Sequence, residues 1–354
     1  MTVPALVDIL LLYWIVMVSL DNVARAAGVS KSVASRALNG DVNARIREET
    51  RTRILEIADQ LGYVPNRRAI ALRFNRSGAI ALIVPDPSNH VFAEMLAGIQ
   101  EVATPAGIDV LVGNVDHAPE GRDAVQRLLK QGRVDGILIQ RREDFDDDEL
   151  REVVPEGIPT VFVNCRLDDR IGSVILPDIE GVRIATEHLI DLGHRDLGFI
   201  GGSPLHDAAI RRRIGFEETL ASHGLVSRPE WVQEFGWEAP DGAAAVDAIL
   251  GRPDRPTGLV VASVNAAVGA LSRLQRAQVK VPEEMSIVGI HTTWVSETVF
   301  PAITTVRMPL SKIGSRAAEM LLGYLDGGAL SDVTIDDPAP ELLVRGTSVA
   351  PAKA

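Results

Sequence analysis

Residues 20–40 read LDNVARAAGVSKSVASRALNG, and this stretch decides the interpretation of the N-terminal part of the chain. Two short helical patterns flank Gly28, which can adopt the positive φ of a tight turn. Ser30 is a typical N-cap for the second helix. The pattern predicts two crossing helices joined by a glycine turn, with these apolar side chains buried between them: Val23, Ala24, Ala27, Val29, Val33 and Leu38.

Two helices joined in this way have the form of a helix-turn-helix, whose second helix contacts base edges through its N-terminal residues. An αα-hairpin inside a helical core is the alternative, because helix pairs with a glycine turn are common. In the first interpretation, the DNA contacts of this segment come from Ser30, Lys31, Ser32, Ser35, Arg36 and Asn39.

The charge distribution supports local contact with nucleic acid. The whole chain has a formal net charge of −12. Residues 21–76 hold eleven lysine and arginine residues against six acids, a net +5, and residues 1–20 carry only Asp8, which leaves −16 for residues 77–354. A basic N-terminal segment on an acidic body is typical of DNA contact confined to one part of a protein.

Two further segments follow the predicted turn. Residues 48–63 are an amphipathic helix pattern that ends at Gly62. Residues 65–76 are too basic and too short to fold alone, which predicts a hinge that orders on DNA, with Leu72 wedged into a minor-groove step. An exposed linker is the alternative. The DNA contacts expected here come from Asn66, Arg68, Leu72 and Arg73.

The first residues are strongly apolar, but Asp8 interrupts them and no lysine or arginine precedes them, which argues against a signal peptide. We expect a mis-assigned start with Met17 as the initiator; a packing or membrane-anchoring extension is the alternative. Cys165 is the only cysteine, so no intramolecular disulfide and no multi-cysteine zinc site can form. A reducing, cytoplasmic setting fits this composition.

From residue 79 onward, short apolar runs alternate with helical patterns, which predicts parallel sheets wound by crossover helices. The number of such units favours two lobes with a cleft. The predicted strands are Ile80–Val84, Asp109–Val112, Gly136–Ile139, Thr160–Val163, Val174–Leu176, Leu197–Ile200, Gly258–Ala262 and Ser286–Ile290. The predicted helices are Phe92–Ala106, Arg122–Gln131, Ile179–Leu192, Ala208–His223, Asp241–Leu250, Ala266–Gln278 and Ser311–Leu325.

The stretches of sequence that carry a family resemblance are VARAAGVSKSVASRALNG (23–40), EETRTRILEIADQLGYVPN (48–66), IALIVPDPSNHVFAEMLAGIQ (80–100), RVDGILI (133–139), ATEHLIDLGHRDLGFIGG (185–202), VPEEMSIVGI (281–290) and PAITTV (301–306). With these blocks, the chain from Met17 onward resembles the LacI/GalR family of transcriptional regulators. The resemblance implies an α/β protein with an all-α helix-turn-helix headpiece and a two-lobed body like that of periplasmic binding proteins. It also implies a homodimer that reads a pseudo-palindromic operator in double-stranded DNA under control of a small-molecule effector.

The resemblance suggests domain boundaries. We expect an apolar extension over residues 1–18, a headpiece over 19–64, a hinge helix over 65–76, an effector-binding and dimerisation domain over 77–348, and a tail over 349–354. Within the body, lobe 1 is expected at about 77–176 and 308–336, and lobe 2 at about 177–307 and 337–348.

Candidate ligand-binding residues follow the predicted strands, where ligands meet sheets of this type. By resemblance, Arg212 matches the arginine that grips ligand oxygens, and Trp237 matches an aromatic platform. A core tryptophan and a solvated arginine are the plain alternatives. The full candidate set is His90, Phe92, Gln140, Asn164, His206, Arg212, Trp237, Ser263, His291 and Trp294.

The chain departs from the family at several of these positions. Val264 and His291 stand where family members carry acids, and Ser263 replaces an asparagine; Asp178 is more often asparagine. The pocket is therefore expected to be less acidic and more cationic than a sugar site, which favours an anionic, aromatic or atypical sugar effector. His291 is expected to make effector affinity vary between about pH 5.5 and 7.5.

Two other classes of protein compete with this interpretation. An enzyme is disfavoured, because the chain contains no phosphate-binding glycine loop and no zinc-protease motif. A secreted binding protein is supported only by the apolar N-terminus. We therefore expect a regulator, most simply a repressor, with no catalytic residues, no metal, no cofactor and no membrane partner.

Overall fold

The computed structural model describes residues 18–38, 44–63, 76–114, 131–143, 145–154, 157–167 and 170–352. It divides into two compact units, Met1–Ser77 and Gly78–Ala354, each described by itself below. The predicted extension before residue 18 and the hinge residues 64–75 lie outside the described residues.

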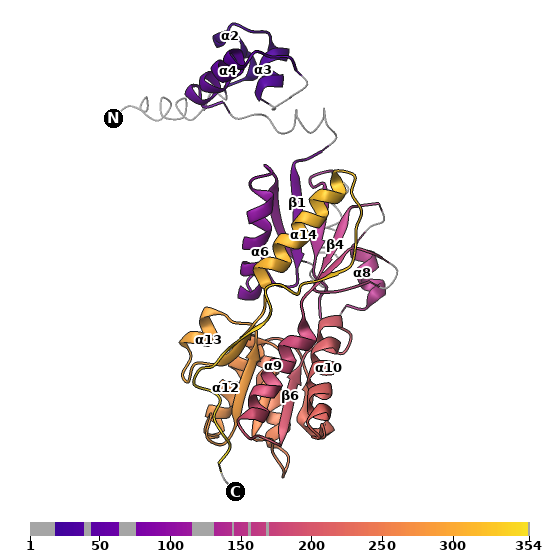
Figure 1. Ribbon diagram of the computed structural model, residues 1–354, viewed down its shortest axis with the longest axis vertical. Coiled ribbons are helices and arrows are strands. Elements are labelled where there is room, and N and C mark those ends of the chain that lie inside the picture. The colour runs from indigo at the N-terminus through magenta and orange to yellow at the C-terminus, as the bar shows by residue number, and fades with distance from the viewer. Residues whose placement is uncertain are drawn as a thin grey trace, which may run out of the picture. The chain divides into compact units, whose positions relative to one another are not determined.

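The first unit, called the headpiece here, contains helices α2 (Leu20–Ala26), α3 (Lys31–Leu38) and α4 (Glu48–Gln60) (Figure 1). Ser19 caps α2, and Gly28 has a φ of 64° in the turn before α3, as the sequence predicts. The predicted burial of Val23, Ala24 and Ala27 is confirmed, but the core is completed by Ala34, Ala37, Ile54 and Ala58. The remaining predicted core residues, Val29, Val33 and Leu38, are only partly buried against it.

The second unit contains two sheets. The first lobe is built on a fully parallel sheet in the order β11-β5-β4-β3-β1-β2. Its strands are β1 (Ala79–Val84), β2 (Asp109–Asn114), β3 (Gly136–Ile139), β4 (Thr160–Val163), β5 (Ser173–Ile175) and β11 (Val333–Thr334), and its described helices are α6 (His90–Ala103), α8 (Asp147–Val153) and α14 (Leu310–Leu325).

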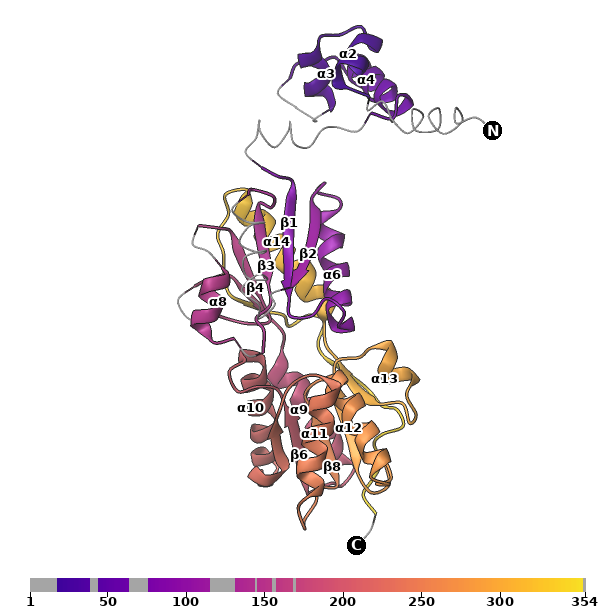
Figure 2. The ribbon, with the colours of Figure 1, turned by 180° about the vertical axis from the view of Figure 1, so that it is seen from behind.

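Alternate residues of these strands pack on opposite faces, as the two-residue period of a strand requires. Ile80 and Leu82 of β1 pack in the cluster that contains α6 and α14, while Ala81 and Ile83 pack in the cluster that contains α8. Helices α6 and α14 lie side by side (Figures 1 and 2). A Cβ atom at Gly98 of α6 would lie 1.9 Å from the Ser311 carbonyl oxygen, so glycine is required for this close approach.

The second lobe is built on a sheet in the order β12-β10-β9-β8-β6-β7. Helices α9 and α10 share one core cluster with the strands, and α11 and α12 share the other. The strands are β6 (Leu197–Gly201), β7 (Val232–Glu234), β8 (Gly258–Val261), β9 (Ser286–Ile290), β10 (Thr304–Arg307) and β12 (Glu341–Leu343). The helices are α9 (Asp178–Asp191), α10 (Asp207–Ser222), α11 (Ala239–Leu250), α12 (Val264–Arg276) and α13 (Trp294–Thr298), with a 3-10 turn at Pro229–Trp231.

Every predicted strand overlaps an observed one, and the two-sheet architecture is confirmed. The sheets are parallel as predicted except at one edge of the second lobe, where β10 and β12 pair antiparallel. The predicted helix Arg122–Gln131 falls largely outside the described residues. The short elements α8, α13, β7, β10, β11 and β12 were not predicted.

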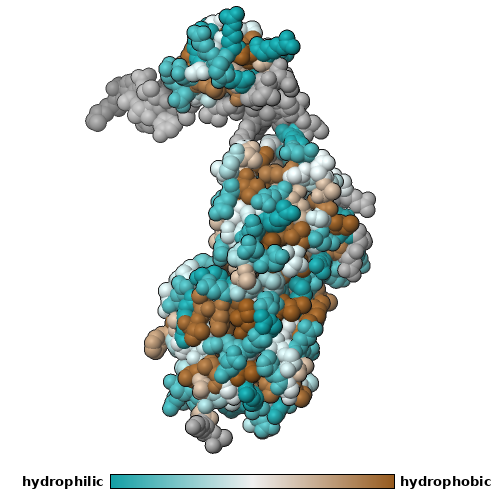
Figure 3. Space-filling model, in the orientation of Figure 1, coloured by the Kyte–Doolittle hydropathy of each residue, from teal (hydrophilic) through white to brown (hydrophobic). Residues whose placement is uncertain are grey.

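The two units differ in the hydropathy of the surface that Figure 3 shows. Figure 3 shows a largely hydrophilic headpiece, whereas apolar side chains gather on the second lobe. None of the helices in the described ranges combines the length and the apolar character needed to cross a membrane.

Candidate DNA-binding and effector sites

Helix α3 presents the predicted DNA-contacting residues at the surface. Lys31, Ser32 and Arg36 are exposed, and Ser35 is half-buried. Ser30 lies just before α3 and accepts a hydrogen bond from the Val33 amide at 3.3 Å, as an N-cap does. The other predicted DNA contacts, Asn39, Asn66, Arg68, Leu72 and Arg73, lie outside the described residues.

One of these cations already has a partner in the free protein. The Lys31 Nζ lies 2.9 Å from Asp21 Oδ2 of α2, and both side chains are more than half exposed. Exposed ion pairs of this kind contribute at most about 1 kcal/mol and are screened by salt. A phosphate can therefore replace Asp21 as the partner of Lys31 at little cost.

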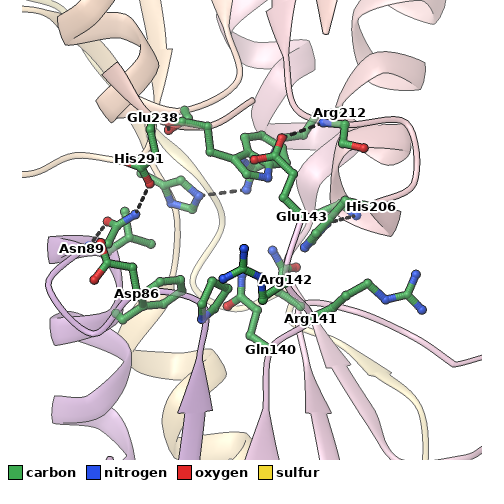
Figure 4. Close-up of a pocket in the computed structure, with 18 of the residues that line it drawn as sticks. Asp86, Asn89, Gln140, Arg141, Arg142, Glu143, His206, Arg212, Glu238 and His291 are labelled. Atoms are coloured by element: carbon green, nitrogen blue, oxygen red, sulfur yellow. Dashed lines mark hydrogen bonds between the residues drawn. The ribbon is translucent and has the colours of Figure 1, made fainter. Parts of the chain in front are cut away.

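A cavity of about 460 Å³ lies in the second unit between the two lobes (Figure 4). The structure brings most of the predicted ligand-binding residues together around it. These are Phe92, Gln140, Asn164, His206, Arg212, Trp237, Ser263 and His291.

Two predicted residues do not line the cavity. His90, at the start of α6, and Trp294, at the start of α13, pack edge-to-face with ring centroids 5.4 Å apart. The Trp294 side chain is 59% exposed. Each follows a strand in the sequence and begins a helix, but neither is among the residues that line the cavity.

Arg212 of α10 is held by partners on three sides. Its Nε donates to Asp178 Oδ1 at 2.7 Å, its Nη1 donates to the Ala262 carbonyl oxygen, and its Nη2 donates to His291 Nε2 at 2.8 Å. The guanidinium also stacks over the Trp237 ring, with Cζ 5.1 Å from the ring centroid. Arg212 is therefore a fixed wall of the cavity and not a solvated side chain.

Asp178 is the counter-ion of this wall. It is fully buried at the start of α9 and also accepts a hydrogen bond from Arg211 Nη2 at 2.7 Å. Burial alone would raise the pKa of the Asp178 carboxyl, but Arg212 and Arg211 hold that pKa below its usual value. Asp178 thus does not face the cavity as an acid; it neutralises the arginines behind the cavity surface.

The expectation that His291 titrates near neutral pH is wrong. The residue is 5% exposed, and burial together with the Arg212 cation lowers the pKa of His291 to about 3. His206, the N-cap of α10, has its pKa lowered to about 4, first by burial and then by Arg212. Both imidazoles are neutral across the range from pH 5.5 to 7.5.

Ser263 and Asn164 use their polar groups within the protein. The Ser263 hydroxyl donates to the Trp237 carbonyl oxygen at 2.7 Å, which holds the segment that carries this indole. Asn164 has a φ of 51°, and its Oδ1 accepts from the Leu176 amide at 3.1 Å and from Arg211 Nη2 at 3.0 Å. Both residues therefore shape the cavity as positioning residues.

Charges of both signs line the cavity, and the expectation that it is less acidic and more cationic than a sugar site stays a prediction. Four acids that sequence reasoning missed line the cavity, Asp86, Glu143, Glu238 and Asp241, against three arginines, Arg141, Arg142 and Arg212. The acids lie in loops or at the start of α11, and only their position after a strand or before a helix could have indicated them.

Hydrogen bonds cross the cavity from one lobe to the other. Glu143 accepts from the Ser203 amide at 2.8 Å, and Asn89 Nδ2 donates to Glu238 Oε1 at 3.2 Å. Arg141 Nη1 donates to the Leu205 carbonyl oxygen at 3.2 Å. These bonds join residues of the two lobes, so the cavity geometry depends on how the lobes are arranged.

The comparisons with known proteins agree with this architecture. Residues 19–66 match the bacterial regulatory proteins of the lacI family, and residues 186–348 match the periplasmic binding protein-like domain. A LacI family transcriptional regulator from Mycobacterium smegmatis, known as a crystal structure, is 54% identical, with a TM-score of 0.74 and coverage of 77% of this chain and 100% of that one.

Two further similarities span the headpiece and the body. The transcriptional regulator RegA of Clostridium saccharobutylicum is 31% identical over 317 residues, which cover 89% of this chain and 94% of RegA. The crystal structure of the lac repressor dimer bound to operator and the anti-inducer ONPF is 27% identical, with a TM-score of 0.78 and coverage of 94% of this chain and 99% of that one.

The protein therefore belongs to the LacI family of transcriptional regulators. It is a DNA-binding regulator whose second unit is an effector-binding domain, and its relatives in the family are transcriptional repressors.

Proposed function

We propose that this chain is a dimeric repressor that binds a pseudo-palindromic operator through α3 and that a small molecule in the cavity between the lobes controls this binding. The observation that carries the proposal is the pairing, in one chain, of an exposed basic helix with a cavity whose walls come from two lobes. The lac repressor, similar over 94% of this chain, is a dimer on operator DNA.

The proposed DNA-contacting residues are Lys31, Ser32, Ser35 and Arg36, with Ser30 as the cap that orients the helix. Lysine and serine side chains at the start of a recognition helix reach base edges in the major groove, and an arginine further along the helix reaches a phosphate or a base. The residues proposed beyond the described part of the headpiece are Asn39, Asn66, Arg68, Leu72 and Arg73.

The effector is proposed to be a sugar or an anionic metabolite. A volume of about 460 Å³ lies within the range of small-molecule sites. Trp237 offers an apolar ring surface, and Gln140 on the opposite wall carries a buried Oε1 that has no hydrogen-bond partner among the described residues. Because a ligand shifts an equilibrium only through different affinities for two states, the bonds that cross the cavity supply the coupling.

The chain is proposed to act without catalysis and in the cytoplasm, where its operator lies. The support is the family membership and the engagement of Arg212, His291 and Glu143 of the cavity in hydrogen bonds within the protein.

A metabolite panel screened by thermal shift on the full chain tests the effector proposal. Compounds that bind in the cavity should lose most of their stabilising effect on Trp237→Ala, while Trp294→Ala, which removes an exposed indole outside the cavity, should respond like the parent. Equal responses of the two variants would place the effector site elsewhere.

Sedimentation of the full chain tests the assembly. We expect a dimer at micromolar concentration, because the lac repressor, which is similar over 94% of this chain, is a dimer on operator DNA. A persistent monomer or a stable tetramer would contradict this assembly.

A further inference from the structure

His291 occupies the deep wall of the cavity in the second lobe. It follows β9 and has a φ of 72°, in the left-handed region that asparagine and aspartate tolerate better than other non-glycine residues. Its backbone amide donates to the Val306 carbonyl oxygen at 2.9 Å, which fixes the position of the side chain.

The contact with Arg212 fixes which ring nitrogen of His291 carries hydrogen. A guanidinium has only donors, so the 2.8 Å contact requires His291 Nε2 to be the acceptor (Figure 4). The neutral ring then carries its hydrogen on Nδ1. This nitrogen is buried and has no hydrogen-bond partner among the residues that the structure describes.

A buried donor without a partner costs free energy that a ligand acceptor can recover. Arg212 adds further donors to this wall. Three of its five N–H groups donate to protein partners, and the other two, one on each Nη atom, remain for a ligand. His206 contributes in the same sense: its Nδ1 accepts from the Ala208 amide at 3.2 Å, so the neutral ring carries its hydrogen on Nε2.

Gln140 does not discriminate between ligands in this way. Its side-chain amide can turn to present either oxygen or nitrogen to a ligand. His291 has no such freedom, because turning the ring would break its contact with Arg212. The histidine is therefore the group in the cavity that specifies the chemistry of the ligand.

We infer that the Nδ1–H of His291 selects effectors that place an acceptor oxygen, a carboxylate or a carbonyl, against the Arg212–His291 wall. This inference rests on the proposed effector site and names its ligand class. The acids Asp86 and Glu238 also line the cavity, so hydroxyl or amino groups of the same ligand have acceptors there.

The position of the hydrogen can be measured without a ligand. In two-bond ¹H–¹⁵N spectra of the full chain labelled with ¹⁵N-histidine, the resonances absent from His291→Asn belong to His291. We expect a protonated Nδ1 and an unprotonated Nε2, unchanged between pH 5.5 and 7.5. A hydrogen on Nε2, or an imidazolium ring in this range, would overturn the inference while leaving the proposed regulator function untouched.

A matched pair of variants tests the selection itself. Asparagine and aspartate have the same shape and tolerate the backbone at position 291, but only asparagine retains an N–H donor. D-galacturonate and N-acetyl-D-glucosamine, which carry a carboxylate and a neutral carbonyl, are titrated against D-galactose and D-glucose. The galacturonate comparison tests an anionic acceptor, and the N-acetylglucosamine comparison tests a neutral one.

D-galacturonate is compared with D-galactose, and N-acetyl-D-glucosamine with D-glucose. We expect the acceptor-bearing sugar of each pair to bind the parent and His291→Asn more tightly than its hexose does. Its affinity for His291→Asp should be about ten-fold lower than for the parent, or lower still. A hexose that binds the parent as tightly as its partner, or a partner that binds His291→Asp undiminished, overturns the inference. If none of the four sugars binds, the position of the hydrogen on the His291 ring decides whether the inference holds. A metabolite panel without any ligand whose binding depends on Trp237 would instead contradict the proposed effector site.

Discussion

Lys31 in the headpiece and Arg212 in the effector-binding domain are both cations with a carboxylate partner, but the two pairs are built differently. The Lys31–Asp21 pair is more than half exposed, whereas Arg212 and Asp178 are almost completely buried and linked to Arg211 and His291. The exposed pair can exchange its partner for a phosphate. The buried group cannot change partners without leaving a charge unpaired, so it can only shape the site and respond to the lobe arrangement.

Neutralising the centre of the buried network should have the largest effect. Asp178→Asn leaves Arg211 and Arg212 without their shared counter-ion, and we expect a loss of about 3–5 kcal/mol in the free energy of unfolding, measured by chemical denaturation. Asp191→Asn, at the exposed end of the same helix, is the control and should change stability by less than about 0.5 kcal/mol. Similar losses for both variants would show that burial of the charge does not matter.

Acid should destabilise the effector-binding domain through its neutral histidines. The pKa values of His291 and His206 are about 3 and about 4 in the folded chain, below the usual 6.5 of the unfolded chain. Between pH 6.5 and these lower values, the unfolded chain therefore binds more protons than the folded chain. Stability should therefore fall as the pH drops below about 6.5, by up to roughly 1.4 kcal/mol per pH unit for each histidine.

Denaturation at pH 7.5, 6.5 and 5.5 measures this fall. The variant His291→Asn cannot titrate at that position and should lose stability less steeply than the parent. If both proteins show the same dependence on pH, His291 is not the neutral, buried group described above.

The exposed cations should affect DNA binding and leave stability unchanged. Arg36→Ala should weaken binding to a selected operator by about ten- to a hundred-fold, and the dependence of affinity on salt should become shallower if Arg36 contacts a phosphate. Arg252→Ala removes the same charge from an exposed loop of the second lobe and should bind DNA like the parent. If Arg36→Ala and the parent bind the operator with equal affinity in a fluorescence anisotropy titration, the proposed contact between Arg36 and DNA is wrong.

The same contrast explains what the sequence could predict. The turn at Gly28, the helices beside it and the strands of both sheets follow from local patterns, because glycine conformation and hydrophobic period act over a few residues. The exposure of Lys31, Ser32 and Arg36 follows from the same helical period. The strands β7 and β11, of three and two residues, are only partly buried, so no apolar run marks them in the sequence.

The effector site depends on contacts between distant segments, which no local pattern encodes. Asp178 and Arg212 are 34 positions apart, and Arg212 and His291 are 79 positions apart. The sequence placed most of the cavity residues at strand ends, but it could not show that Asp178 neutralises the arginines or that Glu143 and Glu238 enter the cavity. It also could not show that His291 is buried, which is why its expected titration near neutral pH is wrong.

The central claim is that a ligand in the cavity controls DNA binding, and one measurement tests it most directly. The affinity of the full chain for a selected operator is measured by fluorescence anisotropy with and without a compound that stabilises the parent but not Trp237→Ala. We predict a change in Kd of about five- to a hundred-fold in the parent and in Trp294→Ala, and none in Trp237→Ala. An operator affinity that such a compound leaves unchanged in the parent would contradict the account.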